Sequence, residues 1–212
     1  MRLRVLAAAL VATLAAGLAA CSSGPTNAAP TAAGTSAAAD AAFPATVATK
    51  FGDVTINAKP TKVVALGWGD AETALALGVQ PVGASDWLGF GGEGVGPWAK
   101  GLYTTPPVII GTMEPSFEKI AALKPDLILD VKGSGDQARY DRLKSIAPTI
   151  GVPKGGDSYL TNQQQQLSMI AAALGEKAKG EALAKEVTDA FTAAAAAHPG
   201  WKGKTVSAVT KT

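Results

Sequence analysis

The sequence predicts an α/β fold, a three-layer lobe with a mainly parallel, Rossmann-like sheet. Short apolar runs alternate with helical stretches along most of the 212 residues. Such runs are typical of strands that are buried on both faces of a parallel sheet, with helices between them. The five expected strands are residues 63–66, 81–84, 108–110, 127–129 and 149–152.

A β-hairpin is expected before the first of these runs. Residues 46–50 and 54–56 have strand composition and flank a short connection that contains Gly52. Between the runs, capping and stop residues bound three helices. These helices are expected at residues 70–77, before Gly78; at 117–123, after a cap by Ser116; and at 137–146, before Pro148.

Two further helices follow the last run. The first has an apolar stripe at helical spacing, formed by Leu167, Ile170, Ala171 and Leu174. The second is long, at residues 177–197, and ends before His198, Pro199 and Gly200. Its stripe consists of Leu183, Val187, Ala190, Phe191 and Ala194.

The last segment, residues 204–209, has the composition of a new strand. A single terminal strand leaves an edge without a partner and has no helix to cover it. We therefore expect the sequence to be a fragment of a two-lobed protein.

The N-terminus predicts an exported lipoprotein. Arg2 and Arg4 precede an uncharged apolar stretch at residues 5–20, which is typical of a secretory signal. The stretch is shorter than the roughly 20 residues that a transmembrane helix needs. The triplet before Cys21 resembles a lipobox, which implies cleavage of residues 1–20 and lipidation of the Cys21 sulfur. The alternative is an unmodified thiol in a disordered leader. Residues 21–43 contain mostly Ala, Ser, Thr, Gly and Pro, which predicts a disordered tether.

Composition excludes several classes of function. Without Arg2 and Arg4 the net charge falls from +2 to 0, so nothing predicts binding to nucleic acid. The single cysteine excludes a disulfide within the chain. His198 is the only histidine and no catalytic motif is present, so we expect neither an enzyme nor a metal site.

Three segments resemble the ferric-siderophore and cobalamin binding proteins of ABC importers: KVVALGWGDAE at residues 62–72, LGVQPVG at 77–83 and EKIAALKPDLIL at 118–129. In that family, one long helix joins two α/β lobes, and the ligand binds in the cleft between them. The resemblance implies a first lobe at residues 44–175, an interlobe helix at 176–198 and the start of a truncated second lobe at 199–212. It also implies a monomer that needs no cofactor, because the iron arrives already chelated.

Aromatic residues follow the expected strands at the end where parallel sheets bind ligands. Trp68 follows the first run, and Trp87 and Phe90 follow the second. Rigid aromatic platforms suit a large flat ligand, because they lose little entropy on binding. The alternative is that these rings pack in the core of the lobe, which we favour for Trp98. The resemblance places Trp68, Trp87 and Thr112 on the wall of the cleft.

Charged residues suggest two further contacts. Lys132 follows the fourth run and would attract an anionic ferric complex, although a solvated surface lysine remains the alternative. Arg139 and Arg142 are expected on the exposed face of a helix. The resemblance assigns Glu118 to docking on the permease, whereas helix-end stabilisation is the simpler role, and the only one expected for Glu72.

The expected function is therefore capture of a ferric siderophore outside the cytoplasm, and its delivery to an ABC permease by a lipid-anchored protein. A cobalamin- or haem-binding protein of the same fold is the main alternative. A lipid-anchored enzyme whose catalytic part is missing, a bare zinc or manganese carrier and a purely structural lipoprotein are weaker ones.

Overall fold

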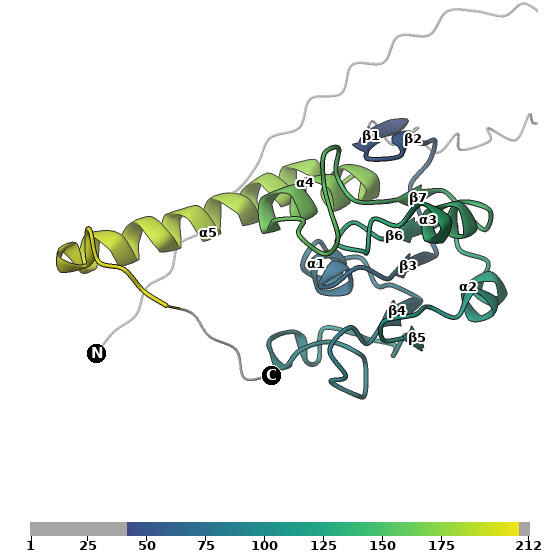
Figure 1. The fold of residues 1–212 in the computed structure, drawn as a ribbon, viewed down its shortest axis with the longest axis horizontal. Coiled ribbons are helices and arrows are strands. Elements are labelled where there is room, and N and C mark those ends of the chain that lie inside the picture. The colour runs from purple at the N-terminus through teal and green to yellow at the C-terminus, as the bar shows by residue number, and fades with distance from the viewer. Residues whose placement is uncertain (1–41, 208–212) are drawn as a thin grey trace, which may run out of the picture. The chain divides into compact units, whose positions relative to one another are not determined.

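A computed structural model describes residues 42–207, and a five-stranded parallel sheet lies at its centre (Figure 1). The strand order is β5-β4-β3-β6-β7, and every neighbouring pair is parallel. All five strands expected from the apolar runs are present. They are β3 (Val63–Ala65), β4 (Gly83–Ser85), β5 (Val108–Gly111), β6 (Leu127–Leu129) and β7 (Thr149–Ile150).

Helices cover both faces of the sheet, which confirms the three-layer α/β fold (Figure 1). One face carries α1 (Asp70–Ala76) and α4 (Gln163–Leu174), and the other carries α2 (Phe117–Leu123) and α3 (Gln137–Lys144). The cap of α2 by Ser116 is also confirmed, because its hydroxyl accepts from the Lys119 N–H at 3.3 Å.

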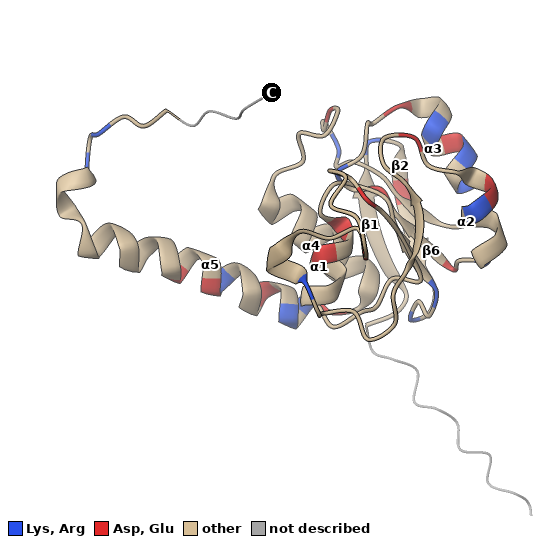
Figure 2. Ribbon diagram, turned by 90° about the horizontal axis from the view of Figure 1, so that it is seen from below, with Lys and Arg blue, Asp and Glu red and all other residues tan. Residues whose placement is uncertain are grey.

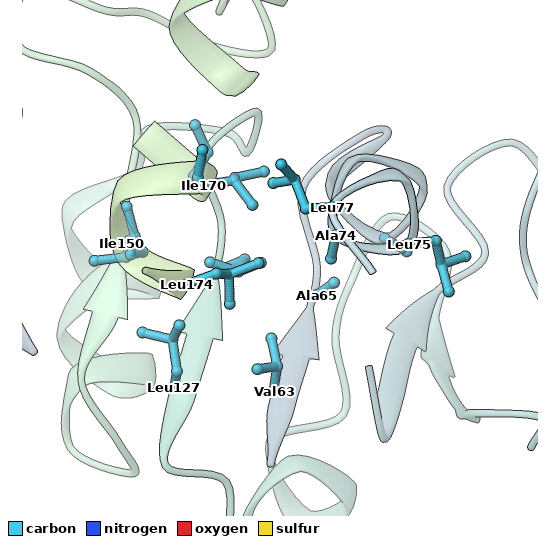
Figure 3. Packing of buried hydrophobic residues seen from close by; sticks show 14 of the residues in the cluster. Val63, Ala65, Ala74, Leu75, Leu77, Leu127, Ile150, Ile170 and Leu174 are labelled. Atoms are coloured by element: carbon cyan, nitrogen blue, oxygen red, sulfur yellow. The ribbon is translucent and has the colours of Figure 1, made fainter. Parts of the chain in front are cut away.

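The strands are apolar throughout because successive side chains point to opposite faces and both faces are buried. Val63 and Leu127 face the cluster shared with α4, where Ile170 and Leu174 lie (Figure 3). Val64 instead belongs to the cluster under α2 and α3. Each fully buried side chain of this size contributes about 1.5–3 kcal/mol to folding.

The expected hairpin is present as β1 (Ala45–Thr49) and β2 (Gly52–Ile56), paired antiparallel. It is attached beside β7: the Lys50 N–H donates to the Val152 carbonyl at 2.9 Å. The ring of Phe51 stacks on Tyr140 of α3 at 4.1 Å between centroids.

The long helix is confirmed as α5 (Lys177–Ala197). Its first half packs against α4, where Gly180 is buried and Leu183 and Val187 are partly buried. The second half differs from the expected stripe, because Ala190, Phe191 and Ala194 are exposed in the described part of the chain. The last charged residue of α5 is Asp189, and the part of the helix beyond it carries no charge (Figure 2).

The strand expected at residues 204–209 is wrong as far as the structure describes it. After a short 3-10 turn at Pro199–Trp201, residues 204–207 are exposed and form neither helix nor strand, while 208 and 209 lie outside the described residues. A strand needs a hydrogen-bonded neighbour, and no described strand lies beside these residues. The expected signal, Cys21 and most of the tether also lie outside the described residues.

Candidate functional site

The site lies at the carboxyl ends of the parallel strands, where the strand order changes direction. From the central strand β3 the chain proceeds to β4 and β5 on one side, and then to β6 and β7 on the other. Open α/β sheets bind ligands at such a switch point. Trp87, Trp68 and Lys132 follow β4, β3 and β6, which are adjacent strands, and Thr112 follows β5 at the sheet edge.

Five aromatic side chains form a continuous row at this end of the sheet. Trp68 and Trp87 are stacked with centroids 5.7 Å apart. Phe90 meets Trp87 edge-on at 5.4 Å and Trp98 edge-on at 5.6 Å. At the other end, Tyr159 lies 4.5 Å from Trp68. These residues, Tyr159, Trp68, Trp87, Phe90 and Trp98, are called the aromatic row below.

The exposure of the row identifies it as a surface and not as part of the core. Trp68, Trp87, Phe90 and Tyr159 are all partly exposed. Trp98, which we expected in the core, is 67% exposed, so that expectation is wrong. The loop that presents it has too few large apolar residues to cover an indole, and Phe90 shares the wall of an adjacent cavity of about 530 Å³.

A buried polar network holds Trp68 from below. The Gln166 amide donates to the Trp68 carbonyl at 2.8 Å and to Asp70 Oδ1 at 2.6 Å. Asp70 Oδ2 accepts from the Val131 N–H at 2.8 Å. Gly67 allows this close approach, because a Cβ there would overlap the Asp70 carboxylate. Burial raises the pKa of Asp70 to about 7, despite these hydrogen bonds.

Two carboxylates hold the loop that carries Trp87 and Phe90. Asp86 accepts from the N–H groups of Phe90 at 2.7 Å and Gly91 at 2.8 Å. Glu72 Oε1 accepts from the Trp87 indole Nε1–H at 3.0 Å. The role expected for Glu72 from the sequence, helix-end stabilisation alone, is therefore incomplete.

The backbone of Lys132 lies next to the row. The Trp68 N–H donates to the Lys132 carbonyl at 3.0 Å, so the two residues are adjacent. Lys132 is partly buried, and within residues 42–207 its ammonium group has no hydrogen bond or ion pair. Thr112 is exposed at the end of β5, one residue beyond the Gly111 carbonyl that accepts from the Asp86 N–H at 2.9 Å.

Arg139 corrects an expectation, because it is not on an exposed face. Its guanidinium forms a bidentate ion pair with buried Asp130, Nη2 to Oδ1 at 2.7 Å and Nε to Oδ2 at 3.0 Å. Nη1 also donates to the Met113 carbonyl at 3.3 Å, so Arg139 joins the ends of β5 and β6. Arg142 is exposed, as expected, and lies 3.6 Å from the Phe117 ring.

Tyr159 is the member of the row that the sequence did not indicate. It lies in the loop between β7 and α4 and has a left-handed backbone, φ 55°. Its N–H donates to the Gly133 carbonyl at 2.9 Å, which holds the loop against the end of β6. Non-glycine residues in this conformation are strained and are concentrated at functional sites.

Glu118 lies apart from the row. It is exposed in the first turn of α2, which covers the face of the sheet opposite α1 and α4 (Figure 2). Its carboxylate accepts from the Ser116 hydroxyl at 3.3 Å.

No group of at least three His, Cys, Asp or Glu in residues 42–207 could hold a metal ion. Within the same residues, no helix combines the length and hydropathy needed to cross a bilayer.

Comparison with known proteins identifies the family. A family model described as "Periplasmic binding protein" matches residues 63–211, which is more than two thirds of the chain. The chain belongs to the periplasmic binding protein family. This is a family of substrate-binding proteins. The matched residues include all five strands of the parallel sheet, and the aromatic row lies at the switch point of that sheet.

Relatives and solved structures agree with this assignment. The probable siderophore-binding lipoprotein YfiY of Bacillus subtilis (strain 168) is 35% identical over 130 residues, 59% of this chain and 37% of YfiY. A periplasmic solute binding protein from Mycobacterium smegmatis has a TM-score of 0.69 at 35% identity, covering 73% of this chain and 55% of that one. PiaA of Streptococcus pneumoniae TIGR4 in complex with ferrichrome has a TM-score of 0.65 at 29% identity, covering 74% and 54%.

The match covers only part of each relative. The chain spans 37% of YfiY and little more than half of the two solved periplasmic binding proteins. The family model itself matches this chain from β3 to beyond the end of α5.

Proposed function

We propose that this periplasmic binding protein captures a ferric siderophore outside the cytoplasm and delivers it to the permease of an ABC importer. The observation that carries the proposal is the aromatic row at the switch point of the sheet, together with Lys132, whose backbone carbonyl accepts from the Trp68 N–H. The proposed ligand-binding residues are Trp68, Trp87, Phe90, Thr112 and Lys132. Tyr159 is added to them on the basis of its contact with Trp68.

The ligand class follows from shape and charge. Stacked indoles offer flat apolar surface that loses little side-chain entropy on binding. A ferric tris-catecholate is anionic, so a cation beside the rings adds charge-assisted hydrogen bonds. The relatives named as siderophore-binding and as a ferrichrome complex support iron complexes over cobalamin or haem.

Titration of tryptophan fluorescence tests the ligand class. The panel consists of ferric catecholates, ferric hydroxamates, haem and cobalamin. We expect quenching by an iron complex, since it would lie against Trp68 and Trp87. Quenching by cobalamin with no response to any iron complex would reverse the assignment.

A charge variant sharpens the same titration. Lys132→Ala should weaken an anionic ferric catecholate by about tenfold, the scale of one hydrogen bond to a charged group. Lys202→Ala is the matched control, because Lys202 is exposed at the far end of α5. Equal affinities of the two variants would remove Lys132 from the site.

Glu118 is proposed to dock on the permease. It is exposed and lies on a different layer from the row. Glu118→Ala should therefore leave siderophore binding intact and reduce uptake by the importer. Glu181→Ala, an exposed carboxylate on α5, serves as the control. Undiminished uptake with Glu118→Ala would contradict the docking role.

Lipid attachment at Cys21 is proposed from the sequence alone. Cys21→Ala should move the protein from the membrane to the soluble exported fraction, measured by fractionation and immunoblotting. Retention of the variant in the membrane would contradict the prediction that Cys21 follows a lipobox.

The lobe organisation is proposed as residues 44–175 for the N-terminal lobe, 176–198 for the interlobe helix and 199–212 for the start of a second lobe. If two lobes share the ligand, the chain alone retains one wall of the cleft. Losing half the contact energy of a micromolar ligand costs about 4 kcal/mol, or roughly a thousandfold in affinity. A longer chain that continues through a second lobe should bind much more tightly, and equal affinity of the two would contradict the two-lobed site. Both should be monomers by size-exclusion chromatography.

A further inference from the structure

Glu72 lies where α1 meets the loop that carries the aromatic row. Its Oε1 accepts from the Trp87 indole Nε1–H at 3.0 Å, and the Gly96 N–H approaches the same oxygen at 3.4 Å. One carboxylate oxygen therefore joins the beginning and the later part of this Gly-rich loop. Because α1 packs against the buried sheet, the carboxylate is held by a rigid element.

Trp87 is the ring whose orientation decides the shape of the row. It contacts Trp68 on one side and Phe90 on the other, at 5.7 and 5.4 Å between centroids. A rotation of this indole would separate the two halves of the row. The hydrogen bond to Glu72 is the polar contact that fixes the indole plane, because Nε1–H is the only donor of a tryptophan side chain.

The second oxygen of Glu72 indicates that helix-end stabilisation does not explain this position. Oε2 is buried and has no hydrogen-bond partner among residues 42–207, and the same holds for the hydroxyl of buried Tyr103. A carboxylate that only favoured the helix N-terminus would remain in water. Burial, and then the charges of Glu72 and Glu93, raise the pKa of Tyr103, consistent with a carboxylate turned inward toward the loop.

We propose that Glu72 is the positioning residue of the aromatic row: its carboxylate fixes the Trp87 indole in the orientation that the ligand meets. The proposal rests on the proposed function, since the ligand is the siderophore assigned there. It makes a sharp distinction between side chains. Glutamine keeps an acceptor oxygen within reach of Nε1–H, whereas alanine has none and aspartate withdraws the carboxylate while keeping its charge.

Hydrogen exchange of the indole N–H tests the positioning without any ligand. The exchange is followed on the indole signals of the four tryptophans in a ¹⁵N-labelled NMR spectrum, where loss of one signal in Trp87→Phe identifies that of Trp87. We expect slow exchange of this N–H in the wild type and in Glu72→Gln, and exchange faster by about tenfold in Glu72→Ala and Glu72→Asp. Glu186→Ala, which borders the same cavity beside α1 but makes no hydrogen bond there, is the matched control.

Binding is measured on the same samples with a gallium(III) tris-catecholate, which is diamagnetic and leaves the spectrum readable even for weak binding. Glu72→Ala and Glu72→Asp should weaken binding about fivefold to tenfold, and Glu72→Gln by less than about twofold. In a Trp87→Phe background, Glu72→Ala should have no further effect.

Three results would overturn the proposal. The first two are an unchanged exchange rate of the Trp87 N–H in Glu72→Ala and an unchanged affinity of that variant for the gallium complex. The third is an affinity of Glu72→Gln as low as that of Glu72→Ala, which would indicate an effect of charge. If Glu72→Ala does not fold, Glu72→Asp decides. A wild-type protein that binds no siderophore complex would contradict the proposed function, and the exchange rates would still decide whether Glu72 positions Trp87.

Discussion

The buried carboxylate of Asp70 should make the stability of the lobe depend on pH in an unusual direction. Burial raises its pKa from 3.8 to about 7 in the folded protein, despite hydrogen bonds from Gln166 and Val131. Between these two values the folded state keeps a proton that the unfolded chain has released. The free energy of unfolding therefore falls as the pH rises through this window, and it is flat above it.

The size of the effect follows from the same two values. One pKa unit corresponds to about 1.4 kcal/mol, so raising the pH from about 4.5 to about 7.5 should lower the free energy of unfolding by about 3 kcal/mol through Asp70 alone. This is a large share of the 5–15 kcal/mol typical of a domain. Asp130 lies close enough to raise the pKa of Asp70 further, whereas the hydrogen-bond donors oppose the shift.

Urea denaturation of the wild type and Asp70→Asn across this pH range is the assay. Asparagine cannot ionise, so the difference in unfolding free energy between the two proteins should change by about 3 kcal/mol, with asparagine relatively favoured at the higher pH. Taking the difference removes the contributions of the other titrating groups. Parallel stability profiles for the two proteins would refute the reasoning.

Three further predictions concern single contacts. Arg139→Gln should destabilise the fold by about 3–5 kcal/mol, because it leaves the Asp130 carboxylate buried without its partner. Burial raises the pKa of Asp126, but three hydrogen bonds lower it by more, so the stability that this carboxylate contributes is lost as the pH falls. Asp126→Asn should therefore lower stability at neutral pH and reduce the loss of stability in acid. Gly180→Leu should cost about 1–3 kcal/mol, because even a Cβ at this position lies 2.6 Å from the Ala171 Cβ where α5 crosses α4.

Each of these variants has a control measured by the same urea denaturation. Lys154→Gln, at an exposed position in the loop after β7, should change stability by less than about 0.5 kcal/mol. Asp53→Asn, at an exposed position of β2, should change stability at neutral pH by less than about 0.5 kcal/mol. Gly200→Ala, beyond α5 with no atom near its Cβ position, should be neutral. A control that matched its test variant would remove the stated cause.

Much of the fold could be predicted because its signals are local. Each strand is a short apolar run, and the cap residues that bound the helices lie next to them in sequence. Trp68 and Trp87 could be placed at the site for the same reason, since each directly follows a strand whose end must lie at the switch point.

The remaining site residues depend on contacts between distant segments. Tyr159 reaches Trp68 only because a left-handed residue turns its loop back onto Gly133. Arg139 lies at a helix position that the sequence pattern predicts to be exposed, and only the folded chain brings it to buried Asp130. The composition of residues 204–209 favours a strand, but a strand also requires a neighbour, and residues 204–207 have none among the described strands.

The strand order has a consequence for how this lobe folds. The central strand β3 pairs on one side with β4, nearby in sequence, where Val64 lies opposite Gly83, and on the other with β6, where Val63 lies opposite Leu127. The second pairing closes a much longer loop, so its entropic cost is larger and it should form later. Until it does, one edge of β3 presents unpaired backbone N–H and C=O groups between apolar side chains. During folding, that edge is where we expect a wrong partner strand to add, and a slow step in β3–β6 pairing would favour aggregation over the native sheet.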